Sequence, residues 1–329
     1  MEKFDIPVAM FIFKRKDTVL RIIDRIREVK PQTFYLIADE GRNEEEKALV
    51  KDCREAVEKA IDWDCNLIKN YAMENRGVHA QIGMGALWVF EREERAIFLE
   101  DDNLPEVSFF EYCKKCLDKY ESEENIFWIC GTNYLQKCQP KNNASVFASR
   151  HLMPCGWASW AWKFKKYYDY DLKNTENAGW RKTLRTKYKN KSLYKQQLRS
   201  ISGELSRKQN GERYRSWDFH TVFSTRMNDL YGIVPCNNQI KNIGVDEFST
   251  HGGNSFNLIM TQRFCGIESY PMPTPIVVPE VKDLDFSFEN KIGKIILYPL
   301  KGRIIMDLRD RLHVPEGVRL RHALLGRKR

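Results

Sequence analysis

The first 131 residues alternate between short apolar runs and longer amphipathic segments, and this alternation constrains the fold more than any other feature of the chain. Five apolar runs have the length of buried strands: 8–13, 33–39, 65–71, 96–100 and 125–131. The segments between them carry apolar residues at helical spacing: 17–30, 43–60, 78–93 and 107–120. Because parallel strands are joined by helical crossovers, the pattern predicts an α/β fold with a mostly parallel sheet flanked by helices.

The second half of the chain is less regular. It holds a segment rich in Trp and Gly at 155–164, a basic segment at 181–215 and a Pro-rich stretch at 271–279. No internal repeat and no low-complexity tract is found. A length of 329 residues fits one large domain or a main domain with additions.

Three consecutive carboxylates, Glu100, Asp101 and Asp102, stand where the fourth apolar run ends. Burying like charges side by side is costly unless they are paired or bind a cation. In open parallel sheets, ligands bind beyond the carboxyl ends of the strands. Arg15 and Asp39 follow the first and second runs. We therefore expect these five side chains at one ligand-binding edge of the sheet.

The chemistry of the triplet favours a hard divalent cation. Carboxylates with no Cys or His beside them are suitable ligands for Mg2+ or Mn2+. A cation held by one or two carboxylates takes its other ligands from water and substrate phosphates. The triplet therefore predicts a nucleotide or another diphosphate as substrate. A plain alternative stays open, because acidic residues at the start of a helix stabilise it without any ligand.

Other protein classes find less support in the sequence. There is no phosphate loop, no G-x-G-x-x-G after the first strand and no G-x-S-x-G elbow. Cys113 and Cys116 form a C-x-x-C without a second pair, which favours two thiols on a helix face over a zinc site. We find no run of about 18 apolar residues and no signal-peptide pattern. With nine cysteines, an odd number, we expect a cytoplasmic protein with reduced thiols.

Six segments occur in a characteristic order: IPVAMFIFKR, LIADEG, FLEDDNLPEVSFFEYC, CGWASWAW, SWDFHTVF and STHGG. Together they resemble GT-A-fold glycosyltransferases, and most closely the N-acetylglucosaminyltransferase I family (glycosyltransferase family 13) and its bacterial relatives. The stretch LEDDNLPEVSFFEY is the most specific part of the resemblance, which covers residues 5 to 255. The resemblance implies a Rossmann-like GT-A domain that transfers a sugar from a UDP-sugar, with UDP-GlcNAc as the first expectation.

The resemblance also implies roles for residues near the donor. Asp102 resembles the ligand of the Mn2+ or Mg2+ ion that bridges the donor phosphates. Glu100 and Asp101 are expected beside the donor, with Asp101 against its ribose or sugar. Asp39 resembles the acid that accepts the uracil N3–H, although a cap or turn is the simpler role for such a residue. Arg15 resembles a donor-binding arginine beside the nucleotide.

Four further positions are implied to contact the donor or the acceptor. His79 resembles a histidine that touches the nucleoside. Gly156 and Trp157 are expected to line the site of the donor sugar and the acceptor, because aromatic faces pack on sugar rings. His251 belongs to a late glycine-flanked stretch that is expected to close over the donor. For His79 and His251 a purely structural role stays open.

Asp218 is the expected general base. Glycosyl transfer with inversion needs a carboxylate that takes the proton of the acceptor hydroxyl, and the resemblance places Asp218 in that role, with Trp217 shaping the pocket. The family motif has a second acid at this point, whereas this chain has Phe219. Glu212 and Asp246 are therefore alternative bases. A capping role for Asp218 at the start of a helix also stays open.

The resemblance divides the chain into three parts. Residues 1–135 are expected to form the nucleotide-sugar-binding half of the GT-A domain and residues 136–260 its acceptor-binding and catalytic half. Residues 261–329 are expected to be a basic C-terminal extension that contacts a membrane or a partner.

The charge distribution leads to expectations about partners. The net charge is +9, and segment 181–215 carries twelve Lys or Arg against two Glu. Such basic patches can meet nucleic acid, anionic lipid or phosphate-bearing substrates, or they can be solvated faces, and charge alone does not choose among these. Our hypothesis is that segment 181–215 and the C-terminal tail hold a cytoplasmic enzyme to the inner face of the cell membrane or to a phosphorylated lipid acceptor. The expected acceptor is a glycan or lipid-linked molecule in surface polysaccharide or lipopolysaccharide synthesis.

Two alternatives from other classes stay open. A nucleic-acid-binding protein would use the same basic segment, with Tyr188, Tyr194 and Tyr214 interleaved. No helix-turn-helix, RRM or zinc-finger pattern supports it, so a nucleic-acid partner is not expected. A non-catalytic sugar-binding relative is disfavoured because the acidic triplet and Asp218 are both intact.

Overall fold

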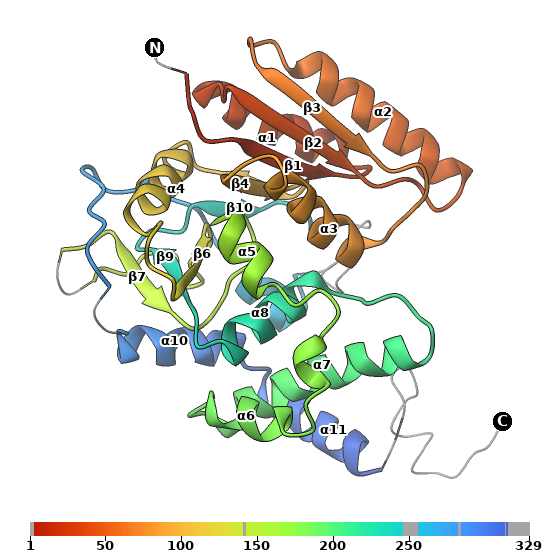
Figure 1. Cartoon of the computed structure of the whole chain (residues 1–329), viewed down its shortest axis with the longest axis vertical. Coiled ribbons are helices and arrows are strands. Elements are labelled where there is room, and N and C mark those ends of the chain that lie inside the picture. The colour runs from red at the N-terminus through yellow and green to blue at the C-terminus, as the bar shows by residue number, and fades with distance from the viewer. Residues whose placement is uncertain (1–2, 141–142, 246–255, 282–283, 313, 315–329) are drawn as a thin grey trace.

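Strands and helices alternate along the chain in the computed structural model, which describes residues 3–140, 143–245, 256–281, 284–312 and 314 (Figure 1). The strands are β1 (Val8–Ile12), β2 (Thr33–Ala38), β3 (Asn66–Tyr71), β4 (Arg95–Glu100), β5 (Asn103–Pro105), β6 (Ile126–Cys130), β7 (Val146–Ser149), β8 (Trp157–Trp160), β9 (Tyr231–Pro235) and β10 (Ile240–Asn242). The α-helices are α1 (Lys16–Val29), α2 (Glu44–Ala60), α3 (Val78–Phe90), α4 (Ser108–Lys119), α5 (Ala161–Tyr167), α6 (Trp180–Thr186), α7 (Lys191–Gln209), α8 (Trp217–Met227), α9 (Ile259–Phe264), α10 (Phe286–Ile296) and α11 (Leu300–Arg311).

In the described residues, the main sheet has eight strands in the order β3-β2-β1-β4-β8-β6-β9-β7. Strands β1 to β4 run parallel to one another, and β6 runs parallel to β9. Strands β8 and β7 run antiparallel to their neighbours. A small antiparallel sheet pairs β10 with β5. The predicted α/β architecture, a mostly parallel sheet flanked by helices, is confirmed and is consistent with a Rossmann-like GT-A fold.

The apolar runs of the sequence become the strands that were predicted from them. Every residue of β1 and β6 is buried, as expected for central strands covered on both faces. The expected cap of the second helix also forms, because Asn43 Oδ1 accepts a hydrogen bond of 2.9 Å from Glu46 N. Five of the described strands, β5, β7, β8, β9 and β10, were not predicted. Among them, the Trp-rich segment forms β8, which lies between β4 and β6.

Helix α3 packs closely on the sheet. A Cβ at Gly85 would lie 2.7 Å from Phe11 Cε1 and 3.1 Å from Ile37 Cγ2, so a larger residue would push α3 away from β1 and β2. The start of α3 is fixed as well, because Gly77 N donates to Asp39 Oδ2 at 3.0 Å directly after β2. The N-terminus of α3 therefore lies at the carboxyl end of β2.

Aromatic rings join three central strands and α8. Trp157 of β8 is stacked between Phe98 of β4 and Trp128 of β6, with ring centroids 4.0 Å apart on each side. The ring of Trp217, at the start of α8, lies 5.9 Å from both tryptophans. Burial of each large ring stabilises the fold by about 1.5–3 kcal/mol. The stack therefore holds α8 against the strand that carries the acidic triplet.

Three helices of the second half share a second apolar cluster. Helices α6, α7 and α8 share an apolar cluster that includes Trp180, Leu184, Ile201 and Phe223. Figure 1 shows α6, α7, α10 and α11 together at the lower end of the molecule, away from β1 to β3. None of the described helices combines the length and the apolar character that crossing a bilayer requires.

A buried lysine closes the connection between α4 and β6. Lys163 of α5 has no exposed surface. Its Nζ donates to the carbonyl oxygens of Tyr120, Glu123 and Ile126 at 2.6, 2.7 and 2.8 Å. These three carbonyls lie at the end of α4, in the following turn and at the start of β6, so one side chain ties these three segments together.

We predict that Lys163→Met lowers the free energy of unfolding by roughly 2–5 kcal/mol, because it removes three hydrogen bonds from a side chain that has no exposed surface. The measurement is the midpoint of urea unfolding. Lys165→Met, at an exposed position of the same helix, is the matched control and should change stability by about 0.5 kcal/mol or less. Equal midpoints for the two variants would contradict the assigned role.

Candidate active site

The acidic triplet lies at the carboxyl end of β4. Glu100 ends the strand, and Asp101 and Asp102 form the turn that leads to β5. Arg15 follows the neighbouring strand β1, and its Nη1 donates to Asp101 Oδ1 at 3.1 Å and lies 3.6 Å from Asp102 Oδ2. The structure thus brings together Arg15 and all three acids, which were predicted from separate parts of the sequence.

The side chain of Asn103 holds the turn at Asp101 and Asp102 through two hydrogen bonds. Its Nδ2 donates to Asp102 Oδ1 at 2.5 Å, and its Oδ1 accepts from Gly156 N at 2.7 Å. Only 1% of Asn103 is exposed, so these bonds form away from solvent. Gly156 has a positive φ of 60°, and a Cβ there would lie 2.5 Å from Ile240 Cδ1. Gly156 therefore lies next to the acidic turn, and only glycine fits this position.

The chain after β10 covers the same turn. Ile243 N donates to Asp102 O at 2.9 Å. A Cβ at Gly244 would lie 2.5 Å from Asp102 Cβ, and Gly244 O accepts from Arg15 Nη2 at 3.3 Å. The predicted His251 and the alternative base Asp246 lie in 246–255, outside the described residues.

A fourth carboxylate acts on the triplet. Burial, reinforced by the negative charges of Asp102, Asp101 and Asp218, holds the pKa of Glu100 well above its usual range, while Arg15 lowers it. Asp218 comes from α8, more than a hundred residues later in the sequence. The structure therefore places Asp218 in the same electrostatic environment as the predicted metal ligand.

Asp218 also has a local role. It lies in the first turn of α8, where acidic residues are favourable. Its Oδ1 accepts a hydrogen bond from Phe219 N at 3.0 Å and another from the hydroxyl of Ser216. Helix α8 begins at Trp217 with Ser216 at the N-cap position, so Asp218 lies inside the first turn and does not occupy the capping position that the alternative requires.

Asp39 is closely bound to the backbone around it. Only 7% of the residue is exposed. Oδ1 accepts from Glu40 N and Arg76 N at 2.9 and 2.8 Å, and Oδ2 accepts from Gly77 N and Asn75 Nδ2 at 3.0 and 3.1 Å. These four donors occupy the lone-pair positions of a carboxylate. In this structure Asp39 holds the loop before α3, and its contact with uracil stays a prediction.

His79 belongs to a buried pair of histidines. Its Nε2 lies 3.3 Å from His220 Nδ1, and His220 Nε2 lies 3.7 Å from Glu204 Oε2. Burial, together with His220, lowers the pKa of His79 to about 3, so its imidazole is neutral at physiological pH. This pair could not be predicted from the sequence, because His220 and Glu204 come from α8 and α7.

An open pocket of about 490 Å3 borders this pair. It is lined by the loop before α3, by residues 170–171 and by the turn between α7 and α8. Tyr170 and Tyr214 place their ring centroids 4.5 and 4.8 Å from that of His79. The alternative base Glu212 also lines this pocket, where it pairs with Arg207 at 3.0 Å.

Two predicted aromatic contacts need correction. Trp157 is 1% exposed and Trp217 is 4% exposed. Both ring faces of Trp157 are covered by Phe98 and Trp128, so no sugar can stack on it. Trp157 is a core residue and does not line the site. Trp217 packs against the same stack and shapes the site only by holding α8 in place.

The residues present fit a metal that binds together with its substrate. Among the described residues, no group of three or more His, Cys, Asp or Glu is arranged to hold a metal ion. Oxygen ligands of the Asp102 type suit Mg2+ or Mn2+, which keep several positions for water and phosphates. Burial, together with the charges of Asp102 and Glu100, raises the pKa of the nearby Cys155 thiol well above its usual range, so this thiol is protonated in the metal-free protein.

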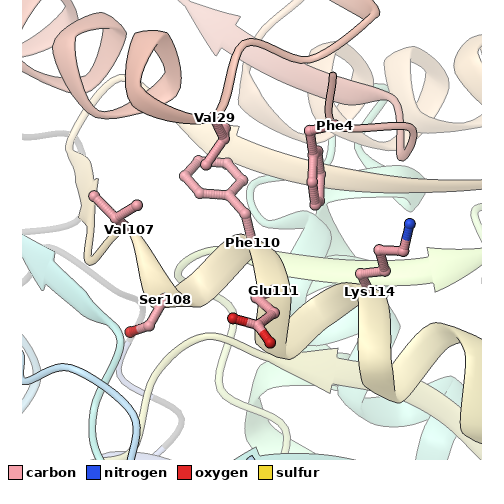
Figure 2. A pocket seen from close by; sticks show the side chains of 7 residues that line it. All are labelled: Phe4, Val29, Val107, Ser108, Phe110, Glu111 and Lys114. Atoms are coloured by element: carbon pink, nitrogen blue, oxygen red, sulfur yellow. The ribbon is translucent and has the colours of Figure 1, made fainter. Parts of the chain in front are cut away.

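A second hollow, of about 430 Å3, lies between α1 and α4 (Figure 2). Its lining residues are Phe4, Val29, Val107, Ser108, Phe110, Glu111 and Lys114. None of the predicted site residues is among them. The hollow is lined mostly by apolar side chains, and we assign no catalytic role to it.

Comparisons with known proteins assign no family to this chain. No protein-family model and no curated protein matches it. Among solved structures, the mannosyltransferase PcManGT from Pyrobaculum calidifontis, in complex with GDP-Man and Mn2+, is 11% identical with a TM-score of 0.37, over 69% of this chain and 70% of its own.

Two nucleotide-dependent enzymes are similar at the same level. A UDP-glucose pyrophosphorylase complexed with UDP-glucose is 10% identical, with a TM-score of 0.35 over 72% of this chain and 91% of its own. The 4-diphosphocytidyl-2C-methyl-D-erythritol synthase from Anaerococcus prevotii is 11% identical, with a TM-score of 0.34 over 54% of this chain and 83% of its own. Likenesses this weak carry no argument about what this chain binds or catalyses.

We predict that Asn103→Ala lowers the free energy of unfolding by about 1–3 kcal/mol, because it leaves the buried N–H of Gly156 without a partner. Chemical denaturation measures the change. Asn66→Ala, at an exposed position on the edge strand β3, is the control and should change stability little. If Asn103→Ala is as stable as the control, the bond to Gly156 does not hold the turn.

Proposed function

We propose that the protein is a metal-dependent glycosyltransferase that moves a sugar from a UDP-sugar to a hydroxyl group. The observation that carries the proposal is the run of three carboxylates at the end of β4, with Arg15 bound to Asp101 and with Asp218 of α8 near enough for its charge to help raise the pKa of Glu100. So much negative charge in a partly buried turn favours the binding of a cation.

Asp102 is the proposed metal ligand. A bound Mn2+ or Mg2+ would neutralise the diphosphate and stabilise the charge that develops on the leaving group. Asn103 holds Asp102 through its amide, and the backbone at Gly244 limits where the carboxylate can move. Both contacts orient the carboxylate before any ligand arrives. Arg15, beside Asp101, is placed to bind a phosphate as well.

Asp218 is the proposed general base. Inversion requires a carboxylate that takes the acceptor proton on the side opposite the leaving group. Asp218 lies on a different element from the triplet, so a sugar held by β4 can have the acceptor approach from α8. The bonds from Ser216 and Phe219 N orient the carboxylate. The leaving diphosphate needs no protein acid.

The proposed classes of donor and acceptor are based on the family resemblance and on where the predicted donor-binding residues lie in the structure. UDP-GlcNAc is the first expected donor, with Asp39 and His79 beside its nucleoside and Glu100 and Asp101 nearer its sugar. A uracil N3–H would compete with Asn75 Nδ2 for Asp39 Oδ2, so nucleotide binding should rearrange the loop before α3. The acceptor is proposed to be a glycan or glycolipid.

We predict that a UDP-sugar with Mn2+ raises the melting temperature by several degrees, because a ligand that binds only the folded state stabilises it. Asp102→Asn should lose the Mn2+-dependent part of the shift. Asp64→Asn, which changes a largely exposed carboxylate, is the control and should keep it. A full Mn2+-dependent shift in Asp102→Asn, or shifts with GDP- and CMP-sugars alone, would refute this assignment.

We predict that Asp218→Asn slows the release of UDP from the donor, with water as acceptor, by about 100-fold or more, because the base is lost. The thermal shift caused by donor and Mn2+ should remain. Glu212→Gln is the matched comparison, since Glu212 is the alternative base. If Glu212→Gln is the slow variant and Asp218→Asn is active, the two roles are exchanged. Normal UDP release by both variants would contradict a carboxylate base at either position.

A further inference from the structure

Helix α11 presents its polar side to the protein. Arg199 of α7 donates to Asp310 at 2.7 Å and also binds Asp307. Arg303 Nη1 donates to Ser192 Oγ at 2.9 Å. No residue of α11 is buried. Charged and polar contacts, rather than an apolar face, therefore hold α11 against α7.

Five apolar residues of α11 and its end are exposed, whereas Met306, on the other side of the helix, is half-buried. Their exposed fractions are 63% for Leu300, 50% for Ile304, 40% for Ile305, 40% for Leu308 and 47% for Leu312. At about 100° per residue, these five residues share one arc of about 140°. Arg303, Asp307 and Asp310, which face α7, lie outside this arc. We call the five residues the α11 stripe.

This arrangement is the reverse of an ordinary surface helix. Such a helix buries its apolar side and turns its charges to water. A contiguous exposed apolar surface on a soluble domain marks a site that another molecule covers. Because the ion pairs with Arg199 fix the rotation of α11, the stripe cannot turn inward without breaking them.

The charges around the stripe indicate what covers it. At about 100° per residue, Lys301 and Arg311 fall within the same arc as the stripe. Residues 300–312 carry four Lys or Arg, at 301, 303, 309 and 311, against two Asp. Figure 1 shows the basic segment of α6 and α7 beside α11, although the two are far apart in the sequence. An exposed apolar stripe that contains two cations is complementary to a surface that is apolar inside and anionic outside, because the long side chains of Lys and Arg can extend to the headgroups.

We propose that α11 lies in the interface of an anionic membrane, with the stripe below the headgroups and Lys301 and Arg311 beside lipid phosphates. Amphipathic helices of this kind lie in the plane of the membrane without crossing it. The proposal does not rest on the proposed function, because it concerns neither the acidic turn nor a sugar. A protein that transfers no sugar would bind the membrane in the same way.

A second copy of the chain fits the stripe less well. A symmetric contact through α11 places the same patch on both copies face to face. Lys301 and Arg311 of one copy would then approach those of the other, and like charges at an apolar contact are unfavourable. Anionic lipids neutralise the same cations. Charge therefore favours the membrane over self-association.

The test is sedimentation of the full chain with vesicles. The vesicles contain phosphatidylcholine with phosphatidylglycerol, or phosphatidylcholine alone, and no sugar nucleotide is present. Wild-type protein should bind the anionic vesicles and keep part of this binding at high salt, because apolar contacts are not screened. The triple variant Leu300→Gln, Ile304→Gln, Leu308→Gln should bind roughly 100-fold more weakly, because three apolar side chains are lost from the interface.

A matched control makes the same chemical change elsewhere. The triple variant Leu49→Gln, Met73→Gln, Met84→Gln alters exposed apolar residues in the first half of the chain and should bind as the wild type does. The proposal is overturned if the α11 variant binds as tightly as this control. It is also overturned if wild-type protein ignores anionic vesicles. A wild-type dimer that the α11 variant converts to a monomer would show that a second copy covers the stripe.

Discussion

Mutual repulsion among the carboxylates at the end of β4 is the constraint on which the rest of the site depends. Glu100, Asp101 and Asp102 follow one another, and Asp218 adds its charge from α8. Arg15 binds Asp101 and lies close to Asp102. The remaining contacts organise the turn, with Asn103 bound to Asp102 and Gly244 packed against it. Under the proposed function, this turn receives a cation that arrives with a diphosphate.

The frame that holds these groups is made from both halves of the chain. The stack of Phe98, Trp157 and Trp128 joins β4, β8 and β6, and Trp217 fixes the start of α8 to it. Asp218 directly follows Trp217. The distance between the proposed base and the metal ligand is therefore set by packed aromatic rings, which move little. Helices α6, α7 and α11 lie at the other end of the molecule and offer a separate surface.

The periodicity of the sequence predicted the helices and strands of the first half well, because buried parallel strands and amphipathic helices have distinct spacings. The rule that ligands bind at carboxyl ends of strands was enough to place Arg15 with the acidic triplet. Contacts between distant residues could not be predicted. Asn103 holds Gly156 across 53 positions. The prediction that Trp157 lines the site was wrong, because aromatic rings pack equally well on sugars and in hydrophobic cores. The orientation of α11, which leaves its stripe exposed, depends on the ion pairs of Arg199 with Asp307 and Asp310. These residues are more than a hundred positions apart, so no local sequence pattern predicts the pairs.

Anomalous diffraction from crystals grown with Mn2+ and UDP tests the central claim most directly. The account predicts a manganese peak at ligand distance from a carboxylate oxygen of Asp102, with the remaining positions filled by the diphosphate and water. A peak at any other group of side chains would contradict it. So would UDP bound elsewhere with the turn after β4 unchanged and free of metal.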